Sequence, residues 1–330
     1  MKSPHQRRPV PRHNKEAHLV LACDVGGTSI KLGLIRDRII LRRTSLDANA
    51  GEGLAAGLVR ISKAARSLCR QAGLRVDKFC GFGLSFPGIV DPRTERILST
   101  PAGKFADAPR LDVSAIVQDQ LGLPVYVGND ANAALAGEWR FGAARKFQNA
   151  VMMTLGTGIG TSVIIEGQPL RGRHGQAGCL GGHLTINPQG AKCGCGNVGC
   201  AEAEASTWAL PDQARAHPGF ARSRLARVKI LDYAAVFAAA ARLDPVALEL
   251  RDRAIRIWAA TVVNLIHAYD PECVVLGGGI MRSQRDILPP LKRHVSRHAW
   301  TPWGRVKIRP AALGNDAGMF GVAAAFLEAH

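Results

Sequence analysis

The sequence lacks any uninterrupted apolar stretch of the roughly 18–20 residues that a membrane-spanning helix requires. Its first fifteen residues, MKSPHQRRPVPRHNK, lack the apolar core of a secretory signal. They also contain no Asp or Glu, as in mitochondrial presequences, but Pro4, Pro9 and Pro11 oppose an amphipathic helix. We therefore expect residues 1–17 to form a disordered basic tail on a cytoplasmic protein with no membrane partner.

Acidic residues are scarce: 26 Asp and Glu stand against 43 Lys and Arg, which gives a formal net charge of +17. Such basicity is typical of nucleic-acid binding. The visible basic clusters, however, lie in the tail and in a segment, 211–230, that Pro218 and Gly219 predict to be a surface loop. Neither cluster interleaves aromatic residues among its basic ones: the tail has none, and the second segment has only Phe220. We interpret the basic residues as part of a solvent-exposed surface and expect no specific nucleic-acid binding.

The length of 330 residues suggests two domains, and a hydrophobic content of 47% is sufficient for a hydrophobic core in each. Apolar runs at 18–23 and at 150–155 each lead through a glycine turn into a second apolar run, at 30–35 and 159–165. Apolar residues at helical spacing in 52–72 and 251–270 predict two helices. The repeated strand, glycine turn and strand predict an internally duplicated α/β architecture.

Three glycine turns follow apolar runs. A turn without side chains lets backbone N–H groups approach a phosphate, and a Thr hydroxyl adds a further donor. Asp24, beside the first turn, is placed to orient a hydrated Mg²⁺. The alternative is that each turn only reverses the chain. The turn residues are Gly26, Gly27 and Thr28; Gly156, Thr157 and Gly158; and Gly277, Gly278 and Gly279.

Three of the eight cysteines are close together, at Cys193, Cys195 and Cys200, and His183 lies ten residues upstream. Three thiolates and one imidazole complete a tetrahedral zinc site, and the glycines between them allow a short knuckle. Because the protein fills all four positions, we expect a structural Zn²⁺. Reduced cysteines in a glycine-rich loop are the alternative.

Asp130 is the candidate catalytic group. The apolar run 125–127 delivers Asn129 and Asp130 to a point where a strand ends and a helix begins. The helix N-terminus is expected to favour the ionised carboxylate and hold its pKa low, which still suits phosphoryl transfer through a loose transition state. The alternative is that Asn129 or Asp130 only caps the helix.

In chain order these motifs resemble the ROK family, which contains repressors, uncharacterised reading frames and sugar kinases. The resemblance covers roughly residues 19–327. It rests on six motifs, which are 24–31 (DVGGTSIK), 87–91 (PGIVD), 128–132 (GNDAN), 155–160 (LGTGIG), the His183 and cysteine knuckle, and 276–279 (LGGG).

The resemblance implies an actin/hexokinase-like fold, in which two ribonuclease-H-like α/β domains enclose a central cleft for ATP and a sugar. Residues 18–128 and 315–330 would form a smaller N-terminal domain, and residues 129–314 a larger domain with the zinc knuckle. It also implies a homodimer or homotetramer.

The resemblance further implies roles for individual residues. Asn129, His183 and Glu202 would bind the sugar, and Asp130 would take the proton from the hydroxyl that is phosphorylated. The first two glycine turns, with Asp24 and Lys31, would hold the phosphates, and Gly277–Gly279 would adjoin adenosine.

One departure concerns substrate recognition. Kinases of the family usually carry a Glu three residues before the zinc-linked His, and Leu180 occupies that place here. We expect an ATP-dependent, glucokinase-like hexose kinase acting on glucose, a related aldohexose or an N-acetylhexosamine. The alternatives are a sugar-responsive regulator and an inactive sugar-binding protein. Regulators of the family carry an N-terminal winged helix of about 60–80 residues, and only some 18 residues precede the first apolar run.

Overall fold

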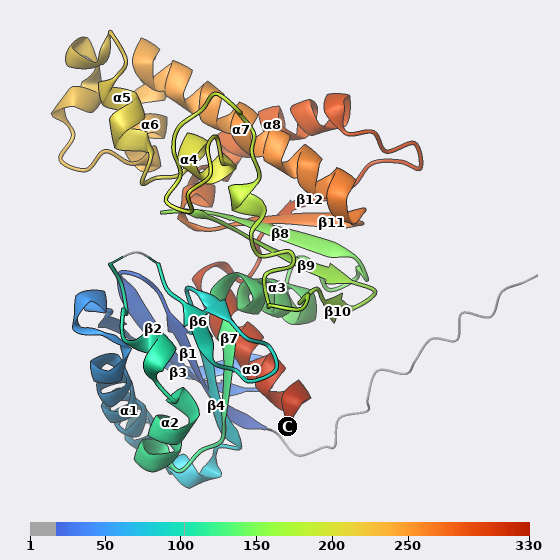
Figure 1. The fold of residues 1–330 in the computed structure, drawn as a ribbon. Coiled ribbons are helices and arrows are strands. Elements are labelled where there is room, and N and C mark those ends of the chain that lie inside the picture. Colours follow the sequence, from blue (N-terminus) through green and yellow to red (C-terminus); the bar gives the residue numbers. More distant parts are fainter. Residues whose placement is uncertain (1–17, 102) are drawn as a thin grey trace, which may run out of the picture.

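The computed structural model describes residues 18–101 and 103–330, so the expected tail at 1–17 lies outside the described residues. Two five-stranded sheets dominate the fold (Figure 1). The first has the strand order β3-β2-β1-β4-β7 and the second the order β10-β9-β8-β11-β12. Their strands are β1 Leu19–Val25, β2 Ser29–Arg36, β3 Ile39–Asp47, β4 Gly81–Phe86, β7 Val125–Asn129, β8 Ala150–Leu155, β9 Ile159–Ile165, β10 Gln168–Pro169, β11 Cys273–Gly277 and β12 Lys307–Pro310.

The two sheets repeat one connectivity. In the first, β1 pairs antiparallel with β2 and parallel with β4, which pairs parallel with β7. In the second, β8 pairs antiparallel with β9 and parallel with β11, which pairs parallel with β12. The expected internal duplication is therefore confirmed. A small hairpin of β5 (Ile89–Val90) and β6 (Ile97–Ser99) follows β4.

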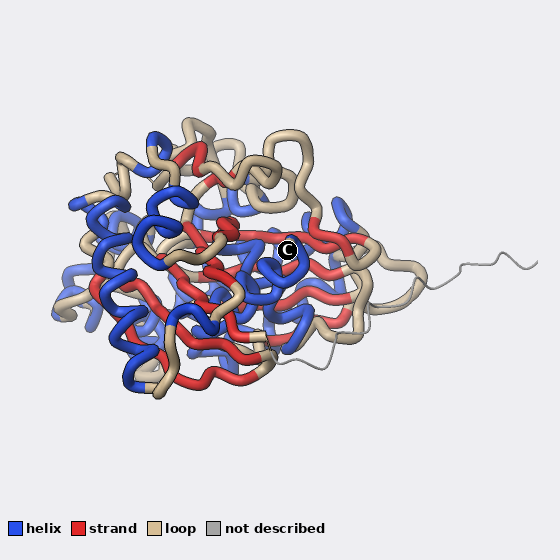
Figure 2. The backbone as a smooth tube through the Cα atoms, turned by 90° about the horizontal axis from the view of Figure 1, so that it is seen from below, coloured by secondary structure: helices blue, strands red, loops and turns tan. Residues whose placement is uncertain are grey.

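Each sheet is covered by helices on both faces, as the almost wholly apolar central strands require. Alternate residues of β1 face two clusters: Leu21 and Cys23 pack with α1 (Leu54–Gln71) and α2 (Val113–Leu121), whereas Val20 and Ala22 pack with α9 (Ala317–Ala329). The second sheet packs on α3 (Asp130–Phe141) through one face. Its other face carries α4 (Ala201–Ala205), α5 (Leu210–Arg215), α6 (Tyr233–Ala240), α7 (Pro245–Tyr269) and α8 (Gln284–His298). Figure 2 shows these layers as red strands between blue helices.

Helices α3 and α9 lie between the two sheets and cross at glycines (Figure 1). A Cβ at Gly321 would lie 1.7 Å from the Ala133 carbonyl oxygen, and one at Gly137 would lie 2.3 Å from that of Ala317. Only glycine therefore permits this close approach. The buried Glu138 accepts hydrogen bonds from the backbone N–H groups of Ala312 and Leu313, which fixes the chain between β12 and α9.

The segment 211–230 differs from the surface loop that its Pro and Gly predict. Its start belongs to α5, and two short 3-10 turns follow. Leu225 is buried against the helices that cover the second sheet. The basic side chains nevertheless remain exposed, at Arg215, Arg222, Arg224, Arg227 and Lys229. None of the helices in the described parts of the chain combines the length and apolar composition that a bilayer crossing requires.

Candidate functional site

Asp24 lies at the centre of a small polar cluster in the first sheet. The strand register places it beside Lys31 of β2 and Ser85 of β4. Ser85 Oγ donates a hydrogen bond to Asp24 Oδ1 at 2.8 Å, and Lys31 Nζ lies 3.3 Å from Oδ2. Lys31 Nζ also donates to the Asn315 carbonyl, just before α9. No sequence pattern predicts Ser85 as a site residue, because only the parallel pairing of β1 with β4 brings it beside Asp24.

Asn129 and Asp130 lie where β7 ends and α3 begins. Asn129 is the N-cap, since its Oδ1 accepts from the Asn132 N–H at 3.0 Å. Asn129 therefore caps the helix. Its Nδ2 remains available to donate to Asp130 Oδ1 at 3.1 Å and to the Gly88 carbonyl at 2.9 Å. Asn129 therefore fixes the orientation of the Asp130 carboxylate.

The pKa of Asp130 is raised to about 7, and the expectation of a low value is wrong. Burial of the carboxylate is the main cause, and the negative charge of Asp24 adds to it. The hydrogen bonds that Asp130 accepts at the start of α3, including one from the Ala131 N–H at 2.8 Å, act in the opposite direction. Desolvation and the neighbouring charge outweigh the helix N-terminus. A carboxylate with a pKa near neutrality is suited to general base catalysis.

Asp24, Lys31 and Asp130 line one cavity of about 470 Å³, together with Gly277–Gly279. This volume lies within the usual range for small-molecule sites. Gly278 has φ +90°, and a Cβ there would lie 2.3 Å from the Leu155 carbonyl oxygen. The third glycine turn therefore packs directly on the end of β8, where the second turn begins.

The second glycine turn, Gly156–Gly158, is held by Glu202 of α4. Glu202 Oε2 accepts a hydrogen bond from the Ile159 N–H at 2.8 Å, and a Cβ at Gly158 would lie 2.4 Å from this oxygen. Trp208 Nε1 donates to Glu202 Oε1 at 3.2 Å. The structure thus brings Glu202, an expected sugar ligand, to an expected phosphate turn.

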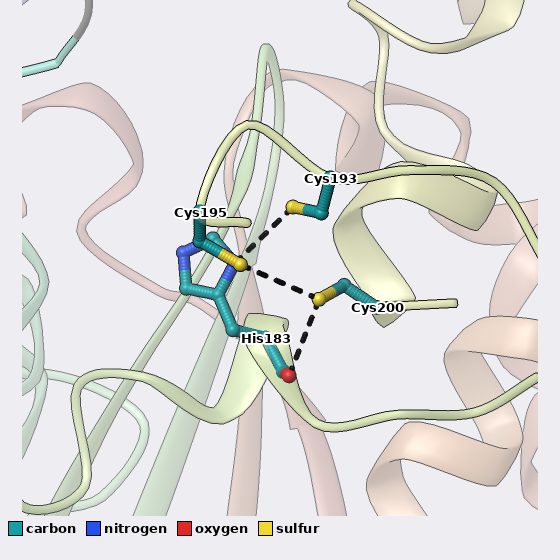
Figure 3. A group of neighbouring side chains, drawn as sticks. All are labelled: His183, Cys193, Cys195 and Cys200. Atoms are coloured by element: carbon teal, nitrogen blue, oxygen red, sulfur yellow. Dashed lines mark hydrogen bonds between the residues drawn. The ribbon is translucent and has the colours of Figure 1, made fainter. Parts of the chain in front are cut away.

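The knuckle residues gather in one cluster, with their candidate ligand atoms all within 4.8 Å of one another (Figure 3). Cys193 Sγ lies 3.6 Å from His183 Nδ1, and Cys195 Sγ lies 3.7 Å from Cys200 Sγ. His183 follows Gly182, where a Cβ would lie 1.8 Å from the Ile159 carbonyl oxygen. The histidine is therefore fixed beside the start of β9.

These distances fit a zinc ion. Tetrahedral zinc with bonds of about 2.3 Å to sulfur and 2.0–2.1 Å to nitrogen separates two sulfurs by about 3.8 Å, and a sulfur from a nitrogen by about 3.6 Å. The observed 3.7 Å and 3.6 Å match these values. The four residues can hold the metal with no position left for water.

The segment that departs from the expected motif runs along β9. Leu180 is 39% exposed. Its neighbour Cys179 is partly buried, and burial raises the pKa of its thiol, with a smaller contribution from the negative charge of Asp130. Cys179 is therefore close to the site. No carboxylate occupies positions 178–183.

Lys104 is a second residue that sequence reasoning missed. Its Nζ lies against the first glycine turn, 2.5 Å from where a Cβ on Gly27 would be. Lys104 belongs to no recognisable motif, and the turn-rich segment around it gave no signal.

Comparison with known proteins identifies the group to which this arrangement belongs. The model of the ROK family matches residues 20–329. The chain belongs to the ROK family. The ROK chain is 31% identical to a glucokinase of Thermotoga maritima over 316 residues, which cover 94% of this chain and 97% of the relative. It is also 30% identical to the xylose repressor of Bacillus subtilis, over 75% of this chain and 61% of that protein.

A solved structure with the same fold is a ROK family glucokinase from Streptomyces griseus in complex with glucose and AMPPNP. The two are 30% identical, with a TM-score of 0.77 and coverage of 93% of this chain and 98% of that one. The fold of this ROK protein is therefore the actin/hexokinase-like fold, in agreement with the duplicated sheets.

Proposed function

We propose that this ROK protein is an ATP-dependent hexose kinase with Asp130 as its general base. The observation that carries the proposal is the Asp130 carboxylate, which has a pKa of about 7 and lines the same cavity as Asp24, Lys31 and the third glycine turn. The family membership and the similarity to glucokinases over almost the whole chain support the same reaction. The substrate is glucose, a related aldohexose or an N-acetylhexosamine.

In this reaction a sugar hydroxyl oxygen attacks the terminal phosphorus of ATP. A new P–O bond forms to the sugar, the bond to the β-phosphate oxygen breaks, and ADP leaves with that electron pair. The proton of the attacking hydroxyl passes to Asp130. Asn129 orients the carboxylate, and general base catalysis of this kind contributes roughly 10²–10⁴ in rate. Asn129, His183 and Glu202 bind the sugar.

The phosphates of ATP lie against the first and second glycine turns, and adenosine lies beside Gly277–Gly279. Asp24 suits the orientation of a hydrated Mg²⁺, since its partly exposed carboxylate already lies between Lys31 and Ser85. The metal neutralises phosphate charge when bound. Zn²⁺ at the knuckle has a structural role, because all its ligands come from the chain. The assembly is a homodimer or homotetramer, which light scattering can determine.

A coupled ADP-release assay over a panel of aldohexoses and N-acetylhexosamines tests the proposal. We expect sugar-dependent ADP release with at least one of them, and a phosphorylated sugar by mass spectrometry. Release with none would contradict the kinase. Sugar binding by calorimetry without turnover would instead indicate an inactive sugar-binding protein. Sequence-selective DNA binding that responds to sugar, measured at stated salt, would indicate a regulator.

A further inference from the structure

The side chain of Lys104 lies across the first glycine turn. A Cβ on Gly27 would be 2.5 Å from Nζ and 3.3 Å from both Cδ and Cε of Lys104. The absence of a side chain at Gly27 is therefore what allows the lysine to lie there. The ammonium group faces the part of the turn that is expected to hold phosphate.

The backbone holds Lys104 at this place. The Phe105 N–H donates to the Ala50 carbonyl at 2.8 Å, and the Ala48 N–H donates to the Thr28 carbonyl at 3.0 Å. Two backbone hydrogen bonds thus connect the loop of Lys104 to the glycine turn through the segment 48–50. Phe105 is fully buried against Phe86, with ring centroids 5.5 Å apart.

Phe105 also adopts φ +51°, a left-handed conformation that is rare for a bulky residue. Strain of this kind is found mainly where the surroundings impose it, often at functional sites. Here the buried ring and the Asp107 carboxylate, which accepts from the Leu54 and Ala55 N–H groups, fix the chain just after Lys104.

The charge of Lys104 is not used by the rest of the described structure. Lys31 is paired with Asp24, whereas no carboxylate in residues 18–101 and 103–330 lies within 4.0 Å of Lys104 Nζ. Within these described residues, the backbone N–H groups of Gly27 and Thr28 donate no hydrogen bond. An unpaired ammonium and two free backbone donors form a site of positive potential, as anion binding requires.

The loop of Lys104 is also linked to Asn129 through Gly88. It follows β6, and Gly88, whose carbonyl accepts from Asn129, lies against the Ser99 carbonyl oxygen of that strand. Lys104 therefore follows a strand that lies against Gly88, the hydrogen-bond partner of Asn129, and its ammonium group lies against the phosphate turn.

We propose that Lys104 binds the terminal phosphate of ATP and stabilises the charge of the phosphoryl group during its transfer. This role rests on the proposed kinase function and adds a residue to it. The lysine acts as a cation only, so no bond to it forms or breaks.

Lys104→Met tests the proposal, because Met keeps the length of the chain and removes the charge. We expect kcat/KM for ATP to fall about ten- to a hundredfold, the range for a lost hydrogen bond to a charged group, while KM for the sugar is unchanged. Lys104→Arg should retain activity within about fivefold. Lys78→Met, at an exposed position just before β4, is the matched control, and its kcat/KM for ATP should equal that of the wild type.

Binding measurements separate this proposal from the kinase function itself. By calorimetry without sugar, Lys104→Met should weaken a non-hydrolysable ATP analogue by about tenfold or more and leave AMP unchanged, whether or not any hexose is turned over. Equal affinity of variant and wild type for the analogue would overturn the role of Lys104. So would an effect on the sugar alone, or an equal loss in Lys104→Arg.

Discussion

Asp24 in β1 and Thr154 in β8 occupy corresponding places in two sheets of the same strand order. The register pairs Asp24 with Lys31 and Ser85, and it pairs Thr154 with Gly160 and Gly277. The first set forms an ion pair and a hydroxyl hydrogen bond to the carboxylate. In the second set Thr154 Oγ1 donates to the Gly160 carbonyl at 3.3 Å, and no charge is present.

The ends of the last parallel strands differ in the same way. β7 leads into Asn129 and Asp130, whereas β12 ends at Pro310 and continues into Ala311. Both ends line the cavity, through Asp130 and through Pro310 and Ala311. The carboxylates that line the cavity thus come from the first sheet and from the helix start that follows it, while the second sheet provides glycine surfaces that leave room for a ligand. Among the described residues, the His and Cys cluster that could hold a metal lies between β10 and α4, beside the second sheet.

If the base that follows the last strand of the first sheet is essential, Asp130→Asn should have the largest effect. We expect kcat to fall by about 10²–10⁴, because the amide cannot accept the proton. ADP release with the best sugar measures this. Asp212→Asn, at a carboxylate 90% exposed in the second half, is the control and should leave kcat unchanged. A fall of less than tenfold for Asp130→Asn would mean that another group is the base.

The knuckle is a feature of the second half, and no such cluster occurs in the described residues of the first. Cys195→Ser should lower the metal content from about one zinc ion per chain and lower the thermal midpoint, since a structural zinc contributes folding free energy. We expect at least about a tenfold loss of activity. Cys80→Ser, at an exposed cysteine remote from the cluster, should change neither. A metal-free and fully active wild-type protein would contradict the zinc assignment.

The charge of Asp24 should be visible in the pH dependence of the base. A general base must be ionised to accept a proton, so under the proposed role of Asp130 kcat/KM of the wild type should fall as pH drops through about 7. Asp24→Asn removes a negative charge that raises the pKa of Asp130, so the midpoint should move to lower pH. The same variant should lose about ten- to a hundredfold in kcat/KM for ATP.

Thr154→Val is the matched change in the second half. It removes a hydroxyl at the corresponding register position and no charge. We expect the midpoint of its pH profile to equal that of the wild type. An unchanged midpoint in Asp24→Asn would show that burial alone sets the pKa of Asp130.

The features that were predictable from the sequence depend on residues close together along the chain. The apolar runs before Gly26 and Gly156 predict the duplicated strands, and the spacing of Cys193, Cys195 and Cys200 predicts that these cysteines form a cluster able to hold a metal. The pKa of Asp130 was not predictable, because a helix N-terminus is visible locally whereas burial and the charge of Asp24 arise from packing. The position of Lys104 likewise depends on backbone contacts between segments far apart in the sequence.

The glycine surfaces of the second half give the smallest expected effect. Gly278→Ala places a Cβ at φ +90° and 2.3 Å from the Leu155 carbonyl oxygen, which should cost about 1–3 kcal/mol of stability and raise KM for ATP as the third turn shifts. Gly279→Ala meets no atom within 4 Å and should stay within about 0.5 kcal/mol of the wild type. Urea unfolding and ATP titration compare the two. Equal stability of both variants would mean that the contact between the third turn and β8 does not constrain the site.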